Sequence, residues 1–100
     1  MHNDILTLVK ESFDTNEYGD SVTIENTREV FCKVKSVGMK EKYQAQAVGL
    51  LPEVVFELPD YYEYDNERKV RYDGEGYRVI RTYKKENNEI ELVVTRDGSA

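Results

Sequence analysis

The sequence has one cysteine and one histidine. Cys32 has no second cysteine with which to form a disulfide within the chain, so packing or assembly must hold this short chain together. One histidine and one cysteine cannot make a zinc site within a single chain. These two shortages exclude a disulfide-bridged scaffold and a zinc domain, and they favour oligomerisation as a source of stability.

Long hydrophobic runs, repeats and linkers are also missing. The apolar run near the N-terminus, "ILTLVK", follows an acidic residue and is too short for a signal-peptide core or a membrane span. We therefore expect no membrane association and a protein that stays in the cytoplasm where it is made. Because no low-complexity tract or internal repeat divides the 100 residues, the sequence predicts a single domain over residues 1–100.

Catalytic and ligand-binding signatures are lacking as well. His2 stands beside the first methionine, where chains are usually mobile, and Cys32 falls on the apolar side of an alternating segment, as a buried side chain would. The turn "DGEG" at 73–76 lacks the strand–loop–helix context of a phosphate loop. The acidic loop at 60–67 lacks EF-hand spacing and is interpreted as a solvated loop. The sequence therefore predicts no enzyme, no metal and no cofactor.

What is present is a series of short alternating segments separated by turn formers. Alternation of apolar and polar residues is typical of strands that have one face in water. The segment "ENT" at residues 25–27 interrupts one of them, which predicts a bulge or two strands joined by a tight connection. The predicted strands are residues 5–11, 21–37, 53–58, 69–72, 77–85 and 90–96, followed by a frayed tail at 97–100.

So many strands in so short a chain cannot cover both faces of one open sheet. Curling the sheet is the economical solution. We therefore predict an all-β fold, a small β-barrel or sandwich of about six strands with one short helix or mobile loop.

The spacing of apolar residues changes after Gly38 and predicts a short helix over 39–48. Gly49 is a plausible terminator, and Pro52 prevents the helix from continuing. A short isolated helix is marginal in water without a surface to dock on, so its apolar stripe is a candidate interface. The stripe consists of Met39, Tyr43, Ala47 and Leu50.

Charge is unevenly spread along the chain. Residues 68–85 carry seven basic and two acidic side chains, a balance of +5, whereas the remaining residues sum to −11. Such asymmetry suits a basic face that meets an acidic face on another copy or on a partner. It also suits a basic patch that binds phosphates, so the charge pattern alone leaves both functions open.

The strand at 77–85 carries aromatic and basic side chains on both predicted faces. Aromatic rings interleaved with cations occur on barrels that bind single-stranded nucleic acid, but cross-strand aromatic pairs also stabilise ordinary hairpins. The net charge of −6 opposes phosphate binding. One face is predicted to hold Tyr77, Val79, Arg81 and Tyr83, and the other Arg78, Ile80, Thr82 and Lys84.

Four segments in combination resemble a known family. These are "VFCKVKSVG", "EKYQAQAVGLLPEVVFEL" and "EYDNERKVRYDGEGYRVIRTYKK", with "IELVVTR" to close. The sequence is similar to the head-closure proteins of tailed bacteriophages, also called head–tail joining, adaptor or stopper proteins. The resemblance covers nearly the whole chain, and these proteins have no catalytic signature.

The resemblance implies a structural virion protein at the head–tail interface, made in the host bacterial cytoplasm or from an integrated prophage. It implies a small β-barrel with a mobile loop or helix after the second long strand. It also implies a homo-oligomeric ring that docks under the portal and adaptor, retains packaged DNA and receives the tail. DNA would pass through the channel without sequence-specific binding.

A ring requires two complementary surfaces on each subunit, and the segregated charges could supply them. Under this interpretation the basic hairpin is an interface element, and Arg78, Arg81 and Tyr83 join the helical stripe as candidate interface residues. The alternatives are a small nucleic-acid-binding β-barrel that uses the hairpin at 68–85 and, more remotely, a hydrolase that uses the acids of the loop at 60–67.

Overall fold

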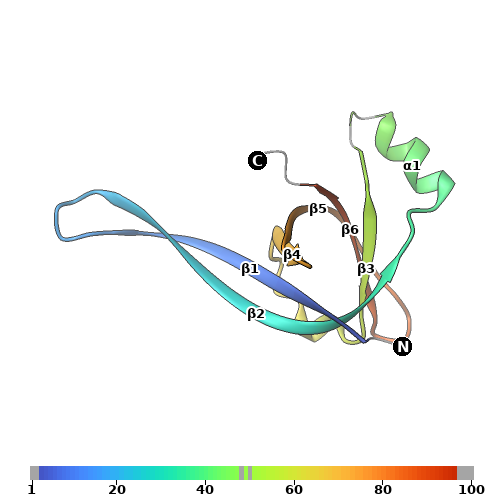
Figure 1. The fold of residues 1–100 in the computed structure, drawn as a ribbon, viewed down its shortest axis with the longest axis horizontal. Coiled ribbons are helices and arrows are strands. Elements are labelled where there is room, and N and C mark those ends of the chain that lie inside the picture. Colours follow the sequence, from blue (N-terminus) through green and yellow to red (C-terminus); the bar gives the residue numbers. More distant parts are fainter. Residues whose placement is uncertain (1–2, 48, 50, 97–100) are drawn as a thin grey trace.

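The computed structural model describes residues 3–47, 49 and 51–96. Within them six antiparallel strands close into a barrel in the order β1-β2-β3-β6-β5-β4 (Figure 1). The all-β prediction with one short helix is therefore confirmed, and the barrel is the form adopted. The elements are β1 (Asp4–Thr15), β2 (Ser21–Lys35), α1 (Met39–Gln46), β3 (Val54–Leu58), the 3-10 turn η1 (Tyr61–Glu63), β4 (Lys69–Tyr72), β5 (Glu75–Lys84) and β6 (Ile90–Arg96).

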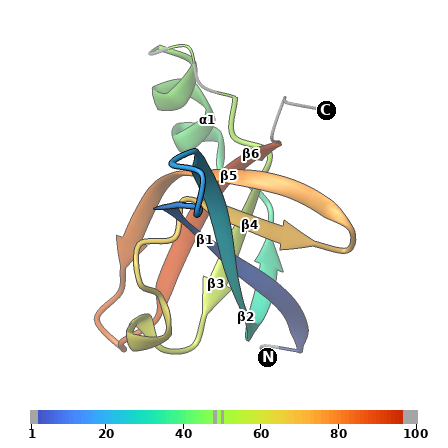
Figure 2. The same ribbon diagram turned by 90° about the vertical axis from the view of Figure 1, so that its left-hand side faces the viewer.

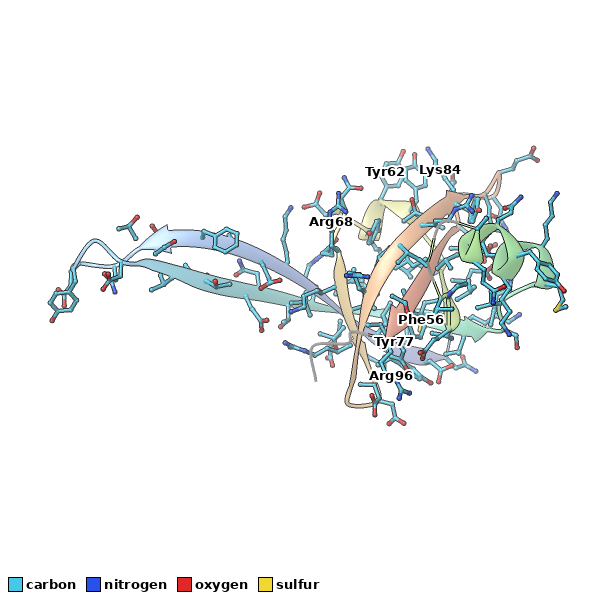
Figure 3. All side chains as sticks on the ribbon, turned by 90° about the horizontal axis from the view of Figure 1, so that it is seen from above. Phe56, Tyr62, Arg68, Tyr77, Lys84 and Arg96 are labelled. Carbon is cyan, nitrogen blue, oxygen red and sulfur yellow. The ribbon has the colours of Figure 1, made fainter. Side chains whose placement is uncertain are left out.

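The interior of the barrel is filled by side chains from all six strands. Phe56 is the largest fully buried side chain, and the rings of Tyr72 and Tyr77 lie at centroid distances of 5.2 and 5.7 Å from its ring. Figure 3 shows Phe56 and Tyr77 close together. Cys32 is fully buried, as its alternation predicted, and this burial, together with the nearby charge of Asp4, raises the pKa of its thiol to about 11. The buried cluster comprises Leu6, Leu8, Val30, Cys32, Phe56, Leu58, Val70, Ile90, Leu92 and Val94.

The pairing of β1 with β2 is continuous, from Asp4 opposite Cys32 to Thr15 opposite Ser21. The interruption predicted at residues 25–27 is therefore wrong. These polar residues lie on an exposed part of β2, where no core has to be covered and strict alternation is not needed.

A bulge is found instead in β5. Val79 pairs with Val94 and Arg81 with Val93, which leaves Ile80 as an extra residue. Because a bulge reverses the alternation, the predicted face of 77–85 is also wrong: Tyr77 packs on the core, whereas Arg81 points outside the barrel toward α1.

The first two strands extend far beyond the barrel as a two-stranded ribbon, residues 11–25, which we call the arm (Figure 1). β4 pairs with β1 only over Thr7–Val9, and β3 pairs with β2 only over Lys33–Lys35. All residues from 10 to 29 are exposed. The arm makes the molecule elongated, with dimensions of 50 × 29 × 24 Å.

The end of the arm is a tight turn fixed by one side chain. Oδ1 of Asn16 accepts hydrogen bonds from the backbone N–H groups of Tyr18 and Asp20, at 2.9 and 3.0 Å. Gly19 adopts a φ of 83°, which a residue without a Cβ atom allows at little cost. The turn predicted from "TNEYGD" is thus confirmed, while the strand before it is longer than the predicted 5–11.

Helix α1 lies outside the barrel at the end opposite the arm (Figures 1 and 2). Its bounds, Met39–Gln46, confirm the helix predicted over 39–48 to within two residues. Nowhere in the described part of the chain is there a helix with the length and apolar character needed to cross a membrane. His2, Leu50 and the tail at 97–100, on which other predictions were made, lie outside the described residues.

Candidate interaction surfaces

Most cations of the basic segment 68–85 are engaged by carboxylates of the same chain. Lys84 lies over the ring of Tyr61, with its Nζ atom 3.6 Å from the centroid. Arg68 and Arg78 are exposed, and no ion pair with the other described residues is found for either. Figure 3 shows Arg68 and Lys84 at the periphery of the barrel. The engaged pairs are Lys69–Glu11 at 3.6 Å, Arg71–Glu25 at 2.9 Å, Arg81–Glu41 at 3.3 Å and Lys85–Glu57 at 2.9 Å.

A four-charge cluster ties three strands and the residue after β5 together on the outside of the barrel. Lys35 contacts Glu91 at 2.6 Å and Glu57 at 3.3 Å, and Lys85 contacts the same two carboxylates. Burial alone would raise the pKa of Glu57, but hydrogen bonds from Lys85 and Lys35 outweigh it and lower this pKa to about 2. Glu57 is therefore ionised at neutral pH, and the cluster is structural.

The acidic loop between η1 and β4 is attached to the base of the arm. Arg28 donates to Oε2 of the buried Glu67 at 2.7 Å, and Lys10 contacts Asp65 at 2.6 Å. The prediction of a solvated loop is thus wrong for Glu67, because Arg28 provides the buried carboxylate with a partner. Among the described residues, no group of three or more acidic, histidine or cysteine side chains could hold a metal ion.

Helix α1 is anchored to the barrel through Glu41. The Oε2 atom of Glu41 accepts hydrogen bonds from the Tyr83 hydroxyl at 2.9 Å and from Arg81 at 3.3 Å. One turn later, Ala45 is almost completely buried. The inner face of the helix is therefore polar and small.

The structure separates the predicted interface residues into two groups. Arg81 and Tyr83 contact the helix of their own chain, whereas Met39 and Tyr43 point outward, each 66% exposed. Ala47 and Arg78 are also exposed. The structure thus does not bring the helical stripe and the basic hairpin together. Sequence reasoning missed the anchoring pair Glu41 and Ala45, whose four-residue spacing was the available signal.

Met39 and Tyr43, one helical turn apart, lie at the centre of the outward side of α1, and Lys40 and Lys42 lie on its two flanks. We call these four residues the outer helix face. Glu41 is the sole acid of the helix, and it points to Arg81 and Tyr83. Two exposed lysines and two exposed apolar side chains therefore remain on the outside. Beside this face, the end of β2 and the start of β3 enclose a concavity of about 660 Å³, with Lys42 and Lys35 in its wall.

The arm is a second surface, and the sequence did not reveal it. Between residues 11 and 25 it has no lysine or arginine. Phe13 is 75% exposed and Tyr18 is 80% exposed. Among the described residues, ion pairs of the arm are found only at its base, from Glu11 to Lys69 and from Glu25 to Arg71. The sequence signal for this surface was a stretch of acidic residues without any basic residue among them. The acidic residues are Glu11, Asp14, Glu17, Asp20 and Glu25.

The sequence matches no protein-family model and no curated protein.

Proposed function

We propose that this protein is a structural subunit of the head–tail connector of a tailed bacteriophage. In this role it forms part of a ring, docks under the portal and adaptor, retains packaged DNA and offers an attachment surface to the tail. The proposal rests on the family resemblance of the sequence, and one structural observation supports it most: a closed barrel carries an uncovered arm.

An uncovered arm is what a subunit of a larger assembly would have. A two-stranded hairpin alone is marginally stable in water at best. The arm nevertheless extends well beyond the last barrel pairing and exposes two aromatic side chains, Phe13 and Tyr18. A partner that covers these side chains would stabilise the arm and bury apolar surface at the same time.

The charge arrangement argues against the alternative of a nucleic-acid-binding barrel. Phosphate binding depends on available cations, but four cations of the 68–85 segment already contact carboxylates of their own chain. Arg68 and Arg78 remain available to bind phosphate, but the acidic arm and the net charge of −6 oppose the approach of nucleic acid. Weak DNA contact suits a channel that must both hold and release DNA.

The test is co-sedimentation with the portal–adaptor complex of the same phage, and separately with short DNA. We expect the wild-type chain to co-sediment with the complex and to show little affinity for DNA at physiological salt. Arg68→Glu/Arg78→Glu is the informative variant because it leaves the contact of Arg81 with α1 intact. Arg81→Glu alone, which should detach the helix, is the matched comparison: it separates the effect of losing the helix contact from the effect of reversing the exposed charges.

Two results would reject the connector role. One is a wild-type chain that never co-sediments with the complex. The other is a salt-sensitive affinity of the wild type for DNA that the double variant loses while it still binds the complex normally; that result would favour the nucleic-acid-binding barrel.

A further inference from the structure

We propose that the arm of one copy docks on the outer helix face of the next copy, so that copies of this chain associate head to tail. The inference rests on the proposed function and deepens it by naming the two surfaces through which subunits meet. It commits to a second copy of this chain as the occupant of both.

The tip of the arm and the outer helix face carry charges of opposite sign. Glu17 and Asp20 lie at the tip of the arm, and no ion pair with other described residues is found for either. The same holds for Lys40 and Lys42 on the outer helix face, where the inward turn of Glu41 leaves no opposing carboxylate on the helix. Placing the two surfaces together pairs unpartnered charges of opposite sign, which favours specific association.

The apolar side chains match in the same way. The arm offers Phe13 and Tyr18, and the helix offers Met39 and Tyr43; all four are at least 66% exposed. Aromatic and methionine side chains are enriched at the centres of protein interfaces. The concavity beside Lys42 adds room for a side chain of the arm tip next to the helix.

The positions of the two surfaces decide how copies can meet. The arm and α1 project from opposite ends of the long axis (Figures 1 and 3), so an arm cannot reach the helix of its own chain. A contact between two different surfaces is heterologous and leads to a ring or an open chain of subunits. Association of two arms instead would oppose Asp14, Glu17 and Asp20 with the same three carboxylates of the other copy, and this like-charge contact is unfavourable.

The sharpest test exchanges the charges of the two surfaces. One variant carries Glu17→Lys/Asp20→Lys in the arm, and the other carries Lys40→Glu/Lys42→Glu on the helix. Each variant then has arm and helix of the same sign, so each alone should associate at least tenfold more weakly than wild type. An equimolar mixture should recover association, because each arm again faces a helix of opposite sign. Sedimentation velocity over a range of concentrations measures this.

The matched control is Glu86→Lys, which makes the same kind of charge change in the turn between β5 and β6, away from both surfaces. It should associate as wild type does. A helix variant that associates normally, or a mixture that does not recover association, would overturn the proposal.

Cross-linking provides a second readout for weak association. Ser21→Cys and Gln46→Cys place thiols on the arm and next to the outer helix face, and buried Cys32 is expected not to react. With a flexible bismaleimide, the double variant should give a ladder of dimers, trimers and larger species, whereas each single variant should give at most dimers. A double variant that is folded and gives no ladder at its highest soluble concentration would also overturn the proposal.

The connector role and this contact fail separately. A chain that co-sediments with the portal–adaptor complex but shows no charge-swap recovery and no ladder would keep its connector role and lose the arm–helix contact. A chain that shows charge-swap recovery and a ladder but does not bind that complex would keep the arm–helix contact and lose its connector role.

Discussion

At the scale of single residues, the stability of the barrel depends on Glu57 more than its position in a strand indicates. Its pKa is lowered from an ordinary 4.5 to about 2, so the ionised form is favoured in the folded state. The stabilisation is therefore fully present above pH 4.5 and is lost as the pH falls toward 2. Allowing for the partial exposure of the two lysines, we estimate about 2 kcal/mol.

We therefore expect Glu57→Gln to lower the free energy of unfolding by about 2 kcal/mol at pH 7, with the difference from wild type shrinking toward zero near pH 2. Urea denaturation followed at a series of pH values provides the measurement. Glu86→Gln, at an exposed turn, is the control and should change little. A Glu57→Gln deficit that is the same at every pH would mean that ionisation of Glu57 is not its cause.

Glu41 is the second residue with an effect beyond its own position, because it holds the helix. Removing its carboxylate in Glu41→Ala breaks the hydrogen bonds to Arg81 and Tyr83. We expect tryptic cleavage after Lys40 and Lys42 to become several-fold faster, because local opening exposes the helix backbone. The melting temperature of the barrel should change by only a few degrees.

Gln44→Ala is the matched control for this prediction, since Gln44 is exposed on the same helix. If cleavage of Glu41→Ala proceeds at the rate of wild type and of the control, the helix is held by other contacts.

At the scale of elements, the arm can be separated from the barrel. It contributes no residue to the buried cluster, and its two ion pairs to the barrel are exposed. We expect a chain in which an Asn-Gly turn replaces residues 11–25 to fold, with a loss of no more than about 2 kcal/mol, since each exposed pair contributes about 1 kcal/mol or less. Near-ultraviolet circular dichroism of the tyrosines and a urea titration would check this. A shortened chain without tertiary signal would contradict it.

The elements also show which parts of the fold the sequence could predict. The strands β3 to β6 were predicted nearly to their bounds because each contributes apolar side chains to the barrel interior and is bounded by turn-forming residues. The arm has no buried face, and only backbone pairing holds its two strands together. Its sequence therefore does not need to alternate between apolar and polar residues, so it indicated neither the length of the arm nor its continuous pairing. The bulge at Ile80 was missed because both predicted faces of residues 77–85 mix apolar and basic side chains, so neither face could be identified as the buried one.

The same physical reason explains the candidate site. An apolar stripe of a helix usually faces the core, but here the barrel offers Arg81 and Tyr83 outside, and these polar groups bind Glu41. The helix is therefore turned so that Met39 and Tyr43 face away from the barrel. Sequence could find the stripe; only the arrangement of β5 determines which way it points.

At the scale of the whole molecule, the arm has a measurable effect on size. The radius of gyration of 14.9 Å exceeds the value of about 13 Å that is typical of a compact chain of this length. We expect small-angle scattering of dilute wild-type protein to show this excess, and the chain without residues 11–25 to show a smaller and more nearly spherical particle. Equal radii for the two chains would indicate that the arm folds back on the barrel.

The closure of the barrel has a consequence for how the molecule opens. The hairpin of β1 and β2 joins the rest of the barrel along two seams of only three residue pairs each, Thr7–Val9 with Lys69–Arg71 and Lys33–Lys35 with Val55–Glu57. Strands β4, β5 and β6 form a local meander, and β3 pairs with β6 over five residue pairs. We therefore expect the β1–β2 hairpin and these four strands to open as two separate cooperative units. Amide hydrogens in the seams should therefore exchange with deuterium before those between β5 and β6. Uniform exchange across the barrel would show a single unit instead. If the seams do open first, two copies at high concentration could exchange hairpins, and an entire hairpin would then be the swapped element.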